Sequence, residues 1–375
     1  YLTDRMLLIG GVRGCGCSAL LHRMLNNDYP EAWYTDFDDP RLGGFDAGDF
    51  TKLDRLLEES GKGIALFNRI DLAAGWIEFC DRKIRQGIKI VSTVSLETLL
   101  RLAKAERPDG TGAVPDIFSL RRLDLFSYNE FLSFTHKPAG EQAVNEFLSR
   151  GAFPGLIKTG HTEALHQLYT EILCKDAVIA GGIRDRNTLQ RMALHLITNT
   201  GEPVTANKLR EKLKIKAVST AAEHMQCIET AGLVRFVSIL SDNPARQAVN
   251  PRKVYAVDTA LAAAVSTAET VDRNKLFETM LFNHLCRESR SVCYTNEQGG
   301  CDFIASDAEG GVRCIQACYD DDPDLMQTKT DGLLWALRQT GASRGTIVTA
   351  DRNDRIDAEN FEIEVIDADT FLGGY

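Results

Sequence analysis

The sequence has no run of about 18 consecutive apolar residues, the length that a helix needs to cross a bilayer. Its opening, YLTDRMLLIGG, also lacks the charged start and apolar core of a signal peptide. We therefore expect a cytoplasmic protein with no membrane partner. Because the first residue is Tyr1 rather than Met, we also expect the native chain to begin further upstream.

An excess of positive charge is missing as well. The 375 residues include 43 Lys and Arg against 53 Asp and Glu, a formal net charge of −10. Such a chain is not attracted non-specifically to nucleic acid, so any DNA contact must depend on a local basic patch.

The ten cysteines include no CxxC pair and stand at irregular positions, which favours reduced intracellular thiols over disulfides. The five that follow residue 285 show no recurring ligand spacing, so we expect no zinc. They are Cys286, Cys293, Cys301, Cys314 and Cys318.

Short apolar runs alternate with helical patterns at the start of the chain. The runs 6–9, 64–67 and 88–93 are followed by the helical patterns 18–25, 73–84 and 96–105. This alternation predicts an α/β domain built on a parallel, doubly wound sheet. The length of the whole chain and its 44% hydrophobic content indicate that further domains follow this one.

The rest of the chain divides into three further predicted regions. Apolar spacing predicts packed helices over 128–196, and a helix, turn, helix and strand series over 209–239 is typical of a winged helix, with Gly232 ending its second helix. Beyond residue 251, strands and helices alternate again. The predicted boundaries are 1–135, 136–198, 199–250 and 251–375.

The segment GVRGCGCS, residues 11–18, lies between a predicted strand and a predicted helix, as a phosphate-binding P-loop does. In the motif GxxxxGK[ST], backbone N–H groups surround phosphates, the lysine neutralises charge and the hydroxyl binds Mg²⁺. Gly11, Gly16 and Ser18 fit this pattern, but Cys17 occupies the lysine position. An ordinary glycine-rich turn without a ligand is the alternative.

Eight segments resemble, in family order, the prokaryotic AAA-type ATP-binding proteins that carry a winged helix and a nuclease-like C-terminal domain. They are LLIGGVRGCGCSALL, FDDPRL, DLAAGW, LDLFSYNEFL, RGAFPGLI, KVYAVDTAL, FETMLFNHL and CDFIAS. The resemblance implies a P-loop NTPase sheet, a winged helix and a restriction-endonuclease-like α/β domain. It also implies a nucleotide-binding set, namely Gly11, Arg13, Gly14, Gly16, Cys17 and Ser18.

In this family an Asp-Glu pair at the end of a strand holds the Mg²⁺ shell and activates water. Asn68 and Arg69 occupy these positions here, and neither can act as the base. Asp71 is the nearby carboxylate in the sequence, and we interpret it as a turn residue. Ser92 and Thr93 stand at the sensor position, although hydroxyl residues are also ordinary at strand ends.

Two loop side chains have alternative roles. Arg13 either faces the phosphates in place of the missing lysine or pairs with a carboxylate near the loop. Cys17 stands at a helix N-terminus, so we expect its thiolate to be favoured, and an inert thiol is a better interpretation than a redox role.

The predicted recognition helix of the winged helix, 219–230, follows a series of basic residues. Glutamates dilute that charge, so a structural or protein-docking role is favoured over DNA binding. The basic residues are Lys208, Arg210, Lys212, Lys214 and Lys216, and the glutamates are Glu211, Glu223 and Glu229.

The nuclease-like region resembles domains that hold Mg²⁺ between an acidic residue and an acid–x–Lys pair. Glu278 and Asp302 remain and could bind a cation weakly, but Gln316 and Cys318 replace the acid–x–Lys residues. We therefore expect no cleavage.

Together these features favour a degenerate AAA-type protein that binds ATP and Mg²⁺ weakly and acts through binding, with a protein partner and DNA as a further ligand. An active ATPase with displaced catalytic groups and a winged-helix DNA-binding regulator are the alternatives.

Overall fold

The computed structural model describes residues 4–105, 117–158, 162–179, 181–241, 243, 250–267, 271–297, 299–320, 322–358 and 360–374. The chain divides into two compact units. The first contains Tyr1–Leu125 and Thr230–Gly232, and the second contains Phe126–Glu229 and Leu233–Tyr375. Across the described segments, no helix combines the length and apolar character that a membrane span requires.

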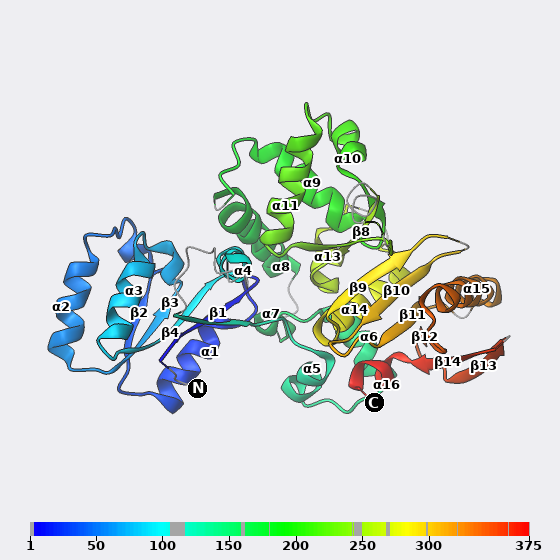
Figure 1. Ribbon diagram of the computed structural model, residues 1–375, viewed down its shortest axis with the longest axis horizontal. Coiled ribbons are helices and arrows are strands. Elements are labelled where there is room, and N and C mark those ends of the chain that lie inside the picture. The colour runs from blue at the N-terminus through cyan, green and yellow to red at the C-terminus, as the bar shows by residue number, and fades with distance from the viewer. Residues whose placement is uncertain are drawn as a thin grey trace. The chain divides into compact units, whose positions relative to one another are not determined.

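The first unit is built on a five-stranded sheet in the order β2-β3-β4-β1-β5, drawn in blue to cyan in Figure 1. All four strand pairs are parallel, so the predicted parallel sheet is confirmed. β1 lies between two other strands, as the strand before a P-loop does. The strands are β1 (Met6–Gly11), β2 (Trp33–Asp36), β3 (Ile64–Asn68), β4 (Lys89–Ser95) and β5 (Phe118–Arg122).

Helices cover both faces of this sheet because its strands are apolar on both faces. On one face Leu21 and Met24 pack against Ile9, Leu66 and Val91. The opposite face carries a larger aromatic core, which includes Phe50, Phe67 and Phe79. The helices are α1 (Cys17–Arg23), which continues as the π-helical turn η1 (Met24–Asp28), and α2 (Phe50–Ser60), α3 (Trp76–Arg85) and α4 (Leu96–Ala105).

The second unit begins with a helical series, as the apolar spacing predicts. Its members are α5 (Tyr128–Thr135), α6 (Glu141–Arg150), α7 (Pro154–Ile157), α8 (Thr162–Glu171), the π-helical segment η4 (Ile172–Ile179) and α9 (Arg186–Thr198). α5 starts with a complete capping box, in which Ser127 and Glu130 each bond the other's backbone N–H.

Two helices and a small antiparallel sheet follow. α10 (Ala206–Leu213) and α11 (Val218–Thr230) precede the hairpin of β7 (Val234–Val237) and β8 (Arg252–Ala256), and the two-residue strand β6 (Pro203–Val204) pairs with β8. α11 ends two residues before Gly232, which has a φ of 84°.

A mixed six-stranded sheet in the order β13-β14-β12-β11-β10-β9 forms the C-terminal part. β11, β12 and β14 are parallel, and the remaining pairs are antiparallel. The strands are β9 (Ser291–Thr295), β10 (Cys301–Ser306), β11 (Val312–Cys318), β12 (Arg344–Thr349), β13 (Asp354–Ala358) and β14 (Phe361–Asp367), and the helices are α13 (Thr259–Val265), α14 (Arg273–Glu288), α15 (Pro323–Thr340) and α16 (Ala368–Gly373).

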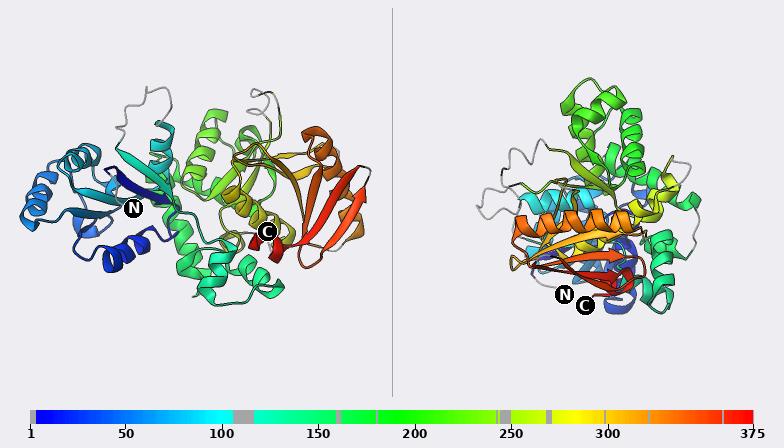
Figure 2. Two further views of the ribbon diagram at one scale, coloured as in Figure 1. Left: turned by 60° about the horizontal axis from the view of Figure 1, so that its bottom comes forward. Right: turned by 90° about the vertical axis from the view of Figure 1, so that its right-hand side faces the viewer.

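The long helix α15, orange in Figure 2, lies along this sheet. Its residues Leu333 and Leu337 pack against Ile347 and Ile363 of the central strands. α14 contributes Phe282, whose ring stacks on Tyr255 with the centroids 4.3 Å apart. This apolar packing fixes the positions of α14 and α15, which carry Glu278 and Lys329, relative to the strands.

Candidate functional site

The loop between β1 and α1 is shaped by glycine. Gly14 and Gly16 have φ values of 87° and 108°, which side-chain-bearing residues rarely adopt. A Cβ atom on Gly11 would lie 2.2 Å from the carbonyl oxygen of Leu123 and 2.6 Å from the Cys15 sulfur. No side chain therefore fits at Gly11 in this conformation.

Four polar side chains meet where the loop faces the ends of the strands. Asn68 accepts hydrogen bonds at Oδ1 from the Ser18 hydroxyl, at 3.0 Å, and from the Thr93 hydroxyl, at 2.6 Å. Its Nδ2 donates to the carboxylate of Asp36 at 2.9 Å. The structure thus brings together three residues that the sequence singled out, and adds Asp36, which it did not.

Ser92 is not part of this group. Its hydroxyl donates to the carbonyl oxygen of Phe67 at 2.8 Å, and the side chain is fully buried. Of the two sensor-position residues, Thr93 therefore contacts Asn68, whereas Ser92 forms a hydrogen bond between neighbouring strands of the sheet.

Arg69 has a left-handed backbone, with a φ of 54°, and its N–H donates to the Thr93 hydroxyl at 2.9 Å. Its Nε donates to Asp71 at 3.0 Å. Asp71 lies in a 3-10 turn and also accepts from the backbone N–H of Ser95 and the Thr98 hydroxyl. Its interpretation as a turn residue is confirmed, because all these contacts fix the turn and the start of α4.

From the sequence, Asp71 was the nearby carboxylate, but the structure places two further carboxylates, Asp36 and Asp38, near the loop. Asp36 ends β2 and touches Asn68, and Asp38 forms an ion pair with Arg13 at 3.6 Å. Strand β2 was not predicted, so its acidic residues could not be placed beside β3. The Arg13 contact matches the expected alternative in which this arginine pairs with a carboxylate near the loop.

Cys15 and Cys17 lie side by side in the loop, with their sulfur atoms 3.4 Å apart. Their hydrogen bond lowers the pKa of Cys15, against the effect of burial. The same hydrogen bond and burial raise the pKa of Cys17, while the positive charge of Arg69 acts in the opposite direction. The expectation that the Cys17 thiolate is favoured is wrong, because its buried neighbour Cys15 takes the negative charge more readily.

In the second unit, the ammonium group of Lys253 joins the two predicted metal-binding carboxylates. Its Nζ lies 2.8 Å from Glu278 Oε1 and 3.1 Å from Asp302 Oδ1. Tyr255 donates to Glu278 Oε1 at 2.6 Å, and Lys329 of α15 pairs with the other oxygen of Asp302. A positive side chain therefore occupies the place between the carboxylates where a cation would have to bind.

Lys253 and Asp302 stay charged although they are largely buried, because opposite charges lie next to each of them. Burial disfavours the charge of Lys253, but the carboxylates of Asp302 and Glu278 outweigh it and raise its pKa. Burial likewise opposes ionisation of Asp302, and the two lysines together with the N–H of Ala317 lower its pKa well below the usual range. Among the described residues, no group of three or more His, Cys, Asp and Glu is placed to hold a metal ion.

Gln316 and Cys318 hold the sheet in place at the acid–x–Lys positions. Gln316 accepts from the N–H of Asp302 at 3.1 Å and donates to the carbonyl oxygens of Gly300 and Lys329. The buried thiol of Cys318 contacts the carbonyl oxygen of Asp320 at 3.5 Å. Both side chains therefore form hydrogen bonds with the protein backbone at these positions.

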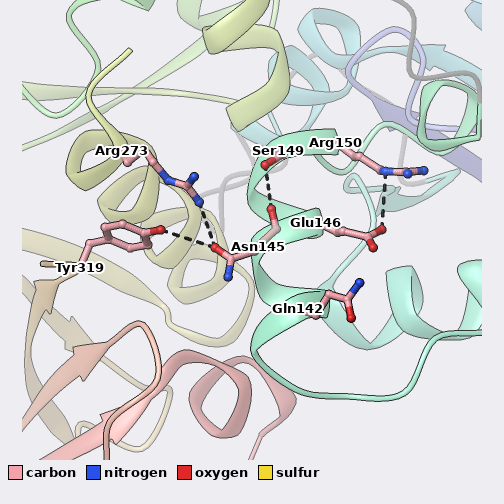
Figure 3. Close-up of a pocket in the computed structure, with 7 residues that line it drawn as sticks. All are labelled: Gln142, Asn145, Glu146, Ser149, Arg150, Arg273 and Tyr319. Atoms are coloured by element: carbon pink, nitrogen blue, oxygen red, sulfur yellow. Dashed lines mark hydrogen bonds and ion pairs between the residues drawn. The ribbon is translucent and has the colours of Figure 1, made fainter. Parts of the chain in front are cut away.

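A hollow of about 440 Å³ lies on the second unit between α6, the start of α14 and the end of β11. Figure 3 shows Arg273 and Tyr319 pointing toward Asn145, to which the guanidinium donates at 2.9 Å. Glu146 pairs with Arg150 on the same helix. These polar groups are bonded to one another, so the hollow does not by itself indicate a ligand.

Comparison with known families identifies two segments. Residues 3–132 match the family described as AAA domain, and residues 141–272 match a domain of unknown function (DUF8612). Each match covers less than half of the chain, and no curated protein matches it. The first unit thus contains an AAA-type P-loop domain.

Solved structures give weaker similarity. The Holliday junction branch migration motor RuvB of Thermotoga maritima is 15% identical, with 62% of this chain and 81% of that chain covered and a TM-score of 0.29. A variant of that motor has 14% identity and the same coverage. Protein VC1899 from Vibrio cholerae is 10% identical over 92% of this chain and 89% of its own, with a TM-score of 0.16. At these scores the similarity carries no argument about function.

Proposed function

We propose that the first unit binds a nucleoside triphosphate such as ATP and acts through binding, with hydrolysis slow or absent. The observation that carries this proposal is the contact of Ser18 and Thr93 with Asn68. The loop hydroxyl, the strand-end residue and the sensor-position hydroxyl lie together, but the residue between them is a neutral amide.

The neutral amide weakens the metal site. P-loop ATPases hold Mg²⁺ with the loop hydroxyl and a strand-end carboxylate. Here the Asn68 oxygen accepts both hydroxyl protons, and its amide nitrogen is directed to Asp36. Asp36 is thus the nearest carboxylate in this group, and it would contribute to a weak Mg²⁺ site on the far side of Asn68.

Positive charge for the phosphates comes from a different position than usual. Cys17 has none, and Arg13 is paired with Asp38. Arg69 is anchored to Asp71, yet its charge still acts on the Cys17 thiol. We infer that Arg69 supplies part of the charge that the loop lysine normally gives.

Calorimetric titration with ATP, with and without Mg²⁺, tests this function. We expect saturable binding with a small Mg²⁺ effect, and weaker binding for Arg69→Gln. Arg82→Gln is the matched control, because Arg82 of α3 pairs with Asp54 of α2, and these helices pack on the opposite face of the sheet from α1. Absence of ATP binding by the folded protein at millimolar concentration would overturn the proposal.

A second candidate function concerns the helices and hairpin over 203–256, which we infer to be a winged helix. The order of β6, α10, α11, β7 and β8 supports it. Lys212 in the last turn of α10, and Lys214 and Lys216 between α10 and α11, are exposed. If these lysines meet DNA phosphates, the logarithm of affinity should fall with the logarithm of salt concentration with a slope of about −3. Absence of such binding supports protein docking.

For the C-terminal sheet we propose a nuclease-like scaffold without cleavage activity. Lys253 neutralises Glu278 and Asp302, and Gln316 is bonded to the backbone at the position of an acidic ligand. Incubation with DNA and Mn²⁺ should therefore give no products, and cleavage that is lost in Asp302→Asn would contradict this assignment.

A further inference from the structure

The two loop cysteines form a close pair that nucleotide binding does not explain. Cys15 and Cys17 flank Gly16, and their sulfur atoms are 3.4 Å apart. A disulfide has a bond length of about 2.05 Å, so the sulfurs need to approach by roughly 1.4 Å. Gly16, with its φ of 108°, is the residue between them and can absorb the backbone change.

The two thiols differ in access. Cys15 is 4% exposed and packs against Gly11, whereas Cys17 is partly exposed. A small oxidant in solution therefore meets Cys17 first. Cys15 is then the nearest thiol that can resolve the product.

We propose that Cys15 and Cys17 are a reversible oxidation site, at which a disulfide closes across Gly16 and reshapes the phosphate-binding loop. The oxidant is a small-molecule disulfide such as oxidised glutathione. As the Cys17 sulfur attacks it, the Cys17 proton passes to the Cys15 sulfur across their hydrogen bond, and one glutathione thiolate is released and takes that proton on. The Cys15 thiolate then attacks the Cys17 sulfur and releases the second. The two cysteine protons end on the two glutathione molecules, and the protein has lost two electrons.

The disulfide would change the part of the loop that carries the phosphate-facing N–H groups. The bond joins side chains on both sides of Gly16, and a Cβ atom on Gly11 would lie 2.6 Å from the Cys15 sulfur. Drawing the sulfurs together must shift the backbone between Val12 and Ser18, the segment that would surround phosphates. We expect oxidation to weaken ATP binding about fivefold or more. This consequence rests on the proposed nucleotide-binding function, but disulfide formation does not.

Peptide mapping tests the site directly, because cleavage after Arg13 and Arg23 releases Gly14 to Arg23 as GCGCSALLHR, with these two cysteines and no other. The folded full chain is treated with oxidised glutathione, denatured, alkylated and digested. We expect this peptide to lose two hydrogens and to take no alkyl group. Exposed Cys174 is the internal control and should carry a mixed disulfide instead.

Serine variants separate the two roles. In Cys15→Ser, the mixed disulfide on Cys17 should persist because the resolving thiol is gone. In Cys17→Ser, Cys15 should remain unmodified. A wild-type peptide that takes two alkyl groups, or keeps glutathione on both cysteines, overturns the proposed site even if a variant fails to fold.

ATP titration before and after oxidation, and again after dithiothreitol, tests the consequence. Weaker binding that dithiothreitol restores supports the switch. A closed disulfide with unchanged ATP affinity overturns the effect on the loop. If the reduced protein binds no ATP, the proposed function fails, while the peptide result still decides whether the oxidation site exists.

Discussion

The hydroxyl of Ser18 donates a 3.0 Å hydrogen bond to the side-chain oxygen of Asn68, although 50 residues separate them in the chain. This contact joins the start of α1 to the end of β3, the two positions between which a P-loop ATPase holds its magnesium ion. The two side chains lie within hydrogen-bond distance of each other, and neither carries a charge. An ordinary glycine-rich turn gives no reason for a hydroxyl and an amide to meet here.

ATP turnover should be no faster than background. Neither Asn68 nor Arg69 can accept a proton from water, and Cys17 brings no charge to the phosphates. The activation of water and the neutralisation of phosphate charge, which supply most of the rate enhancement, are therefore missing. A steady-state phosphate-release assay checks this. Robust turnover that disappears in Ser18→Ala would show that displaced groups, such as Asp36, carry the reaction.

The change Cys17→Lys should raise ATP affinity about tenfold or more. A charge-assisted contact to phosphate is worth about 1.5–3 kcal/mol if the loop already fits the ligand. Cys17→Ser, which removes the thiol without adding charge, is the matched control and should leave the affinity near that of the parent protein. If the folded lysine variant does not bind ATP, the loop has been remodelled beyond the missing charge.

The change Asn68→Asp should make the first unit dependent on a divalent cation. It replaces an amide that donates to Asp36 with a carboxylate, so two negative charges face each other at hydrogen-bond distance. We expect a lower melting temperature in EDTA, a loss on the order of 1–3 kcal/mol, and recovery with millimolar Mg²⁺. The double variant Asp36→Asn, Asn68→Asp again pairs one carboxylate with one amide. Its melting temperature should therefore depend less on Mg²⁺ than that of Asn68→Asp.

The parallel sheet of the first unit could be predicted because β1 and β3 contain continuous apolar runs, β4 contains a shorter one, and each is followed by a helical pattern. Strand β2 was missed because its four residues, WYTD, are all half-buried and give no apolar run. That omission hid Asp36 and Asp38, since a carboxylate cannot be assigned to a sheet edge when its strand is unknown.

In the C-terminal part, the resemblance to nuclease-like domains predicted that Glu278 and Asp302 lie near each other, and the structure brings both onto Lys253. Neither Lys253 nor Lys329 was singled out, because they lie 25 and 27 residues from their carboxylate partners and follow no local motif. β13, β14 and α16 were also missed. Long-range pairings of this kind depend on strand order, which periodicity alone does not fix.

Replacing Lys253 with methionine should destabilise the second unit and create a demand for a cation. The change leaves Glu278 and Asp302 buried without their shared counter-charge, which typically costs about 3–5 kcal/mol. Mn²⁺ should recover part of the loss in a thermal unfolding assay. Lys275→Met is the control: Lys275 pairs with the exposed Glu202, so it should lose less than about 1 kcal/mol and show no Mn²⁺ effect.

Asp258 gives a prediction for pH. This carboxylate, 2% exposed, caps α13 by accepting the N–H of Leu261 at 2.7 Å, and it also accepts the N–H of Ala152 at 2.6 Å. Burial raises its pKa to about 6, although the hydrogen bonds from the Ala152, Leu261 and Ala260 backbone partly offset that effect. The unfolded chain should ionise near the usual value of about 3.9.

Between about pH 4 and pH 6 the folded protein therefore keeps a proton on Asp258 that the unfolded chain has released. Because the folded state binds more protons there, the contribution of Asp258 to the free energy of unfolding should fall as pH rises through this window, by on the order of 2–3 kcal/mol, and stay low above it. In Asp258→Asn, which cannot ionise, this slope should be absent, even if the amide fits the two N–H donors less well. Urea unfolding at several pH values checks the difference between the two proteins, and parallel curves between pH 4 and pH 6 would mean that Asp258 ionises in the folded state as it does in the unfolded chain.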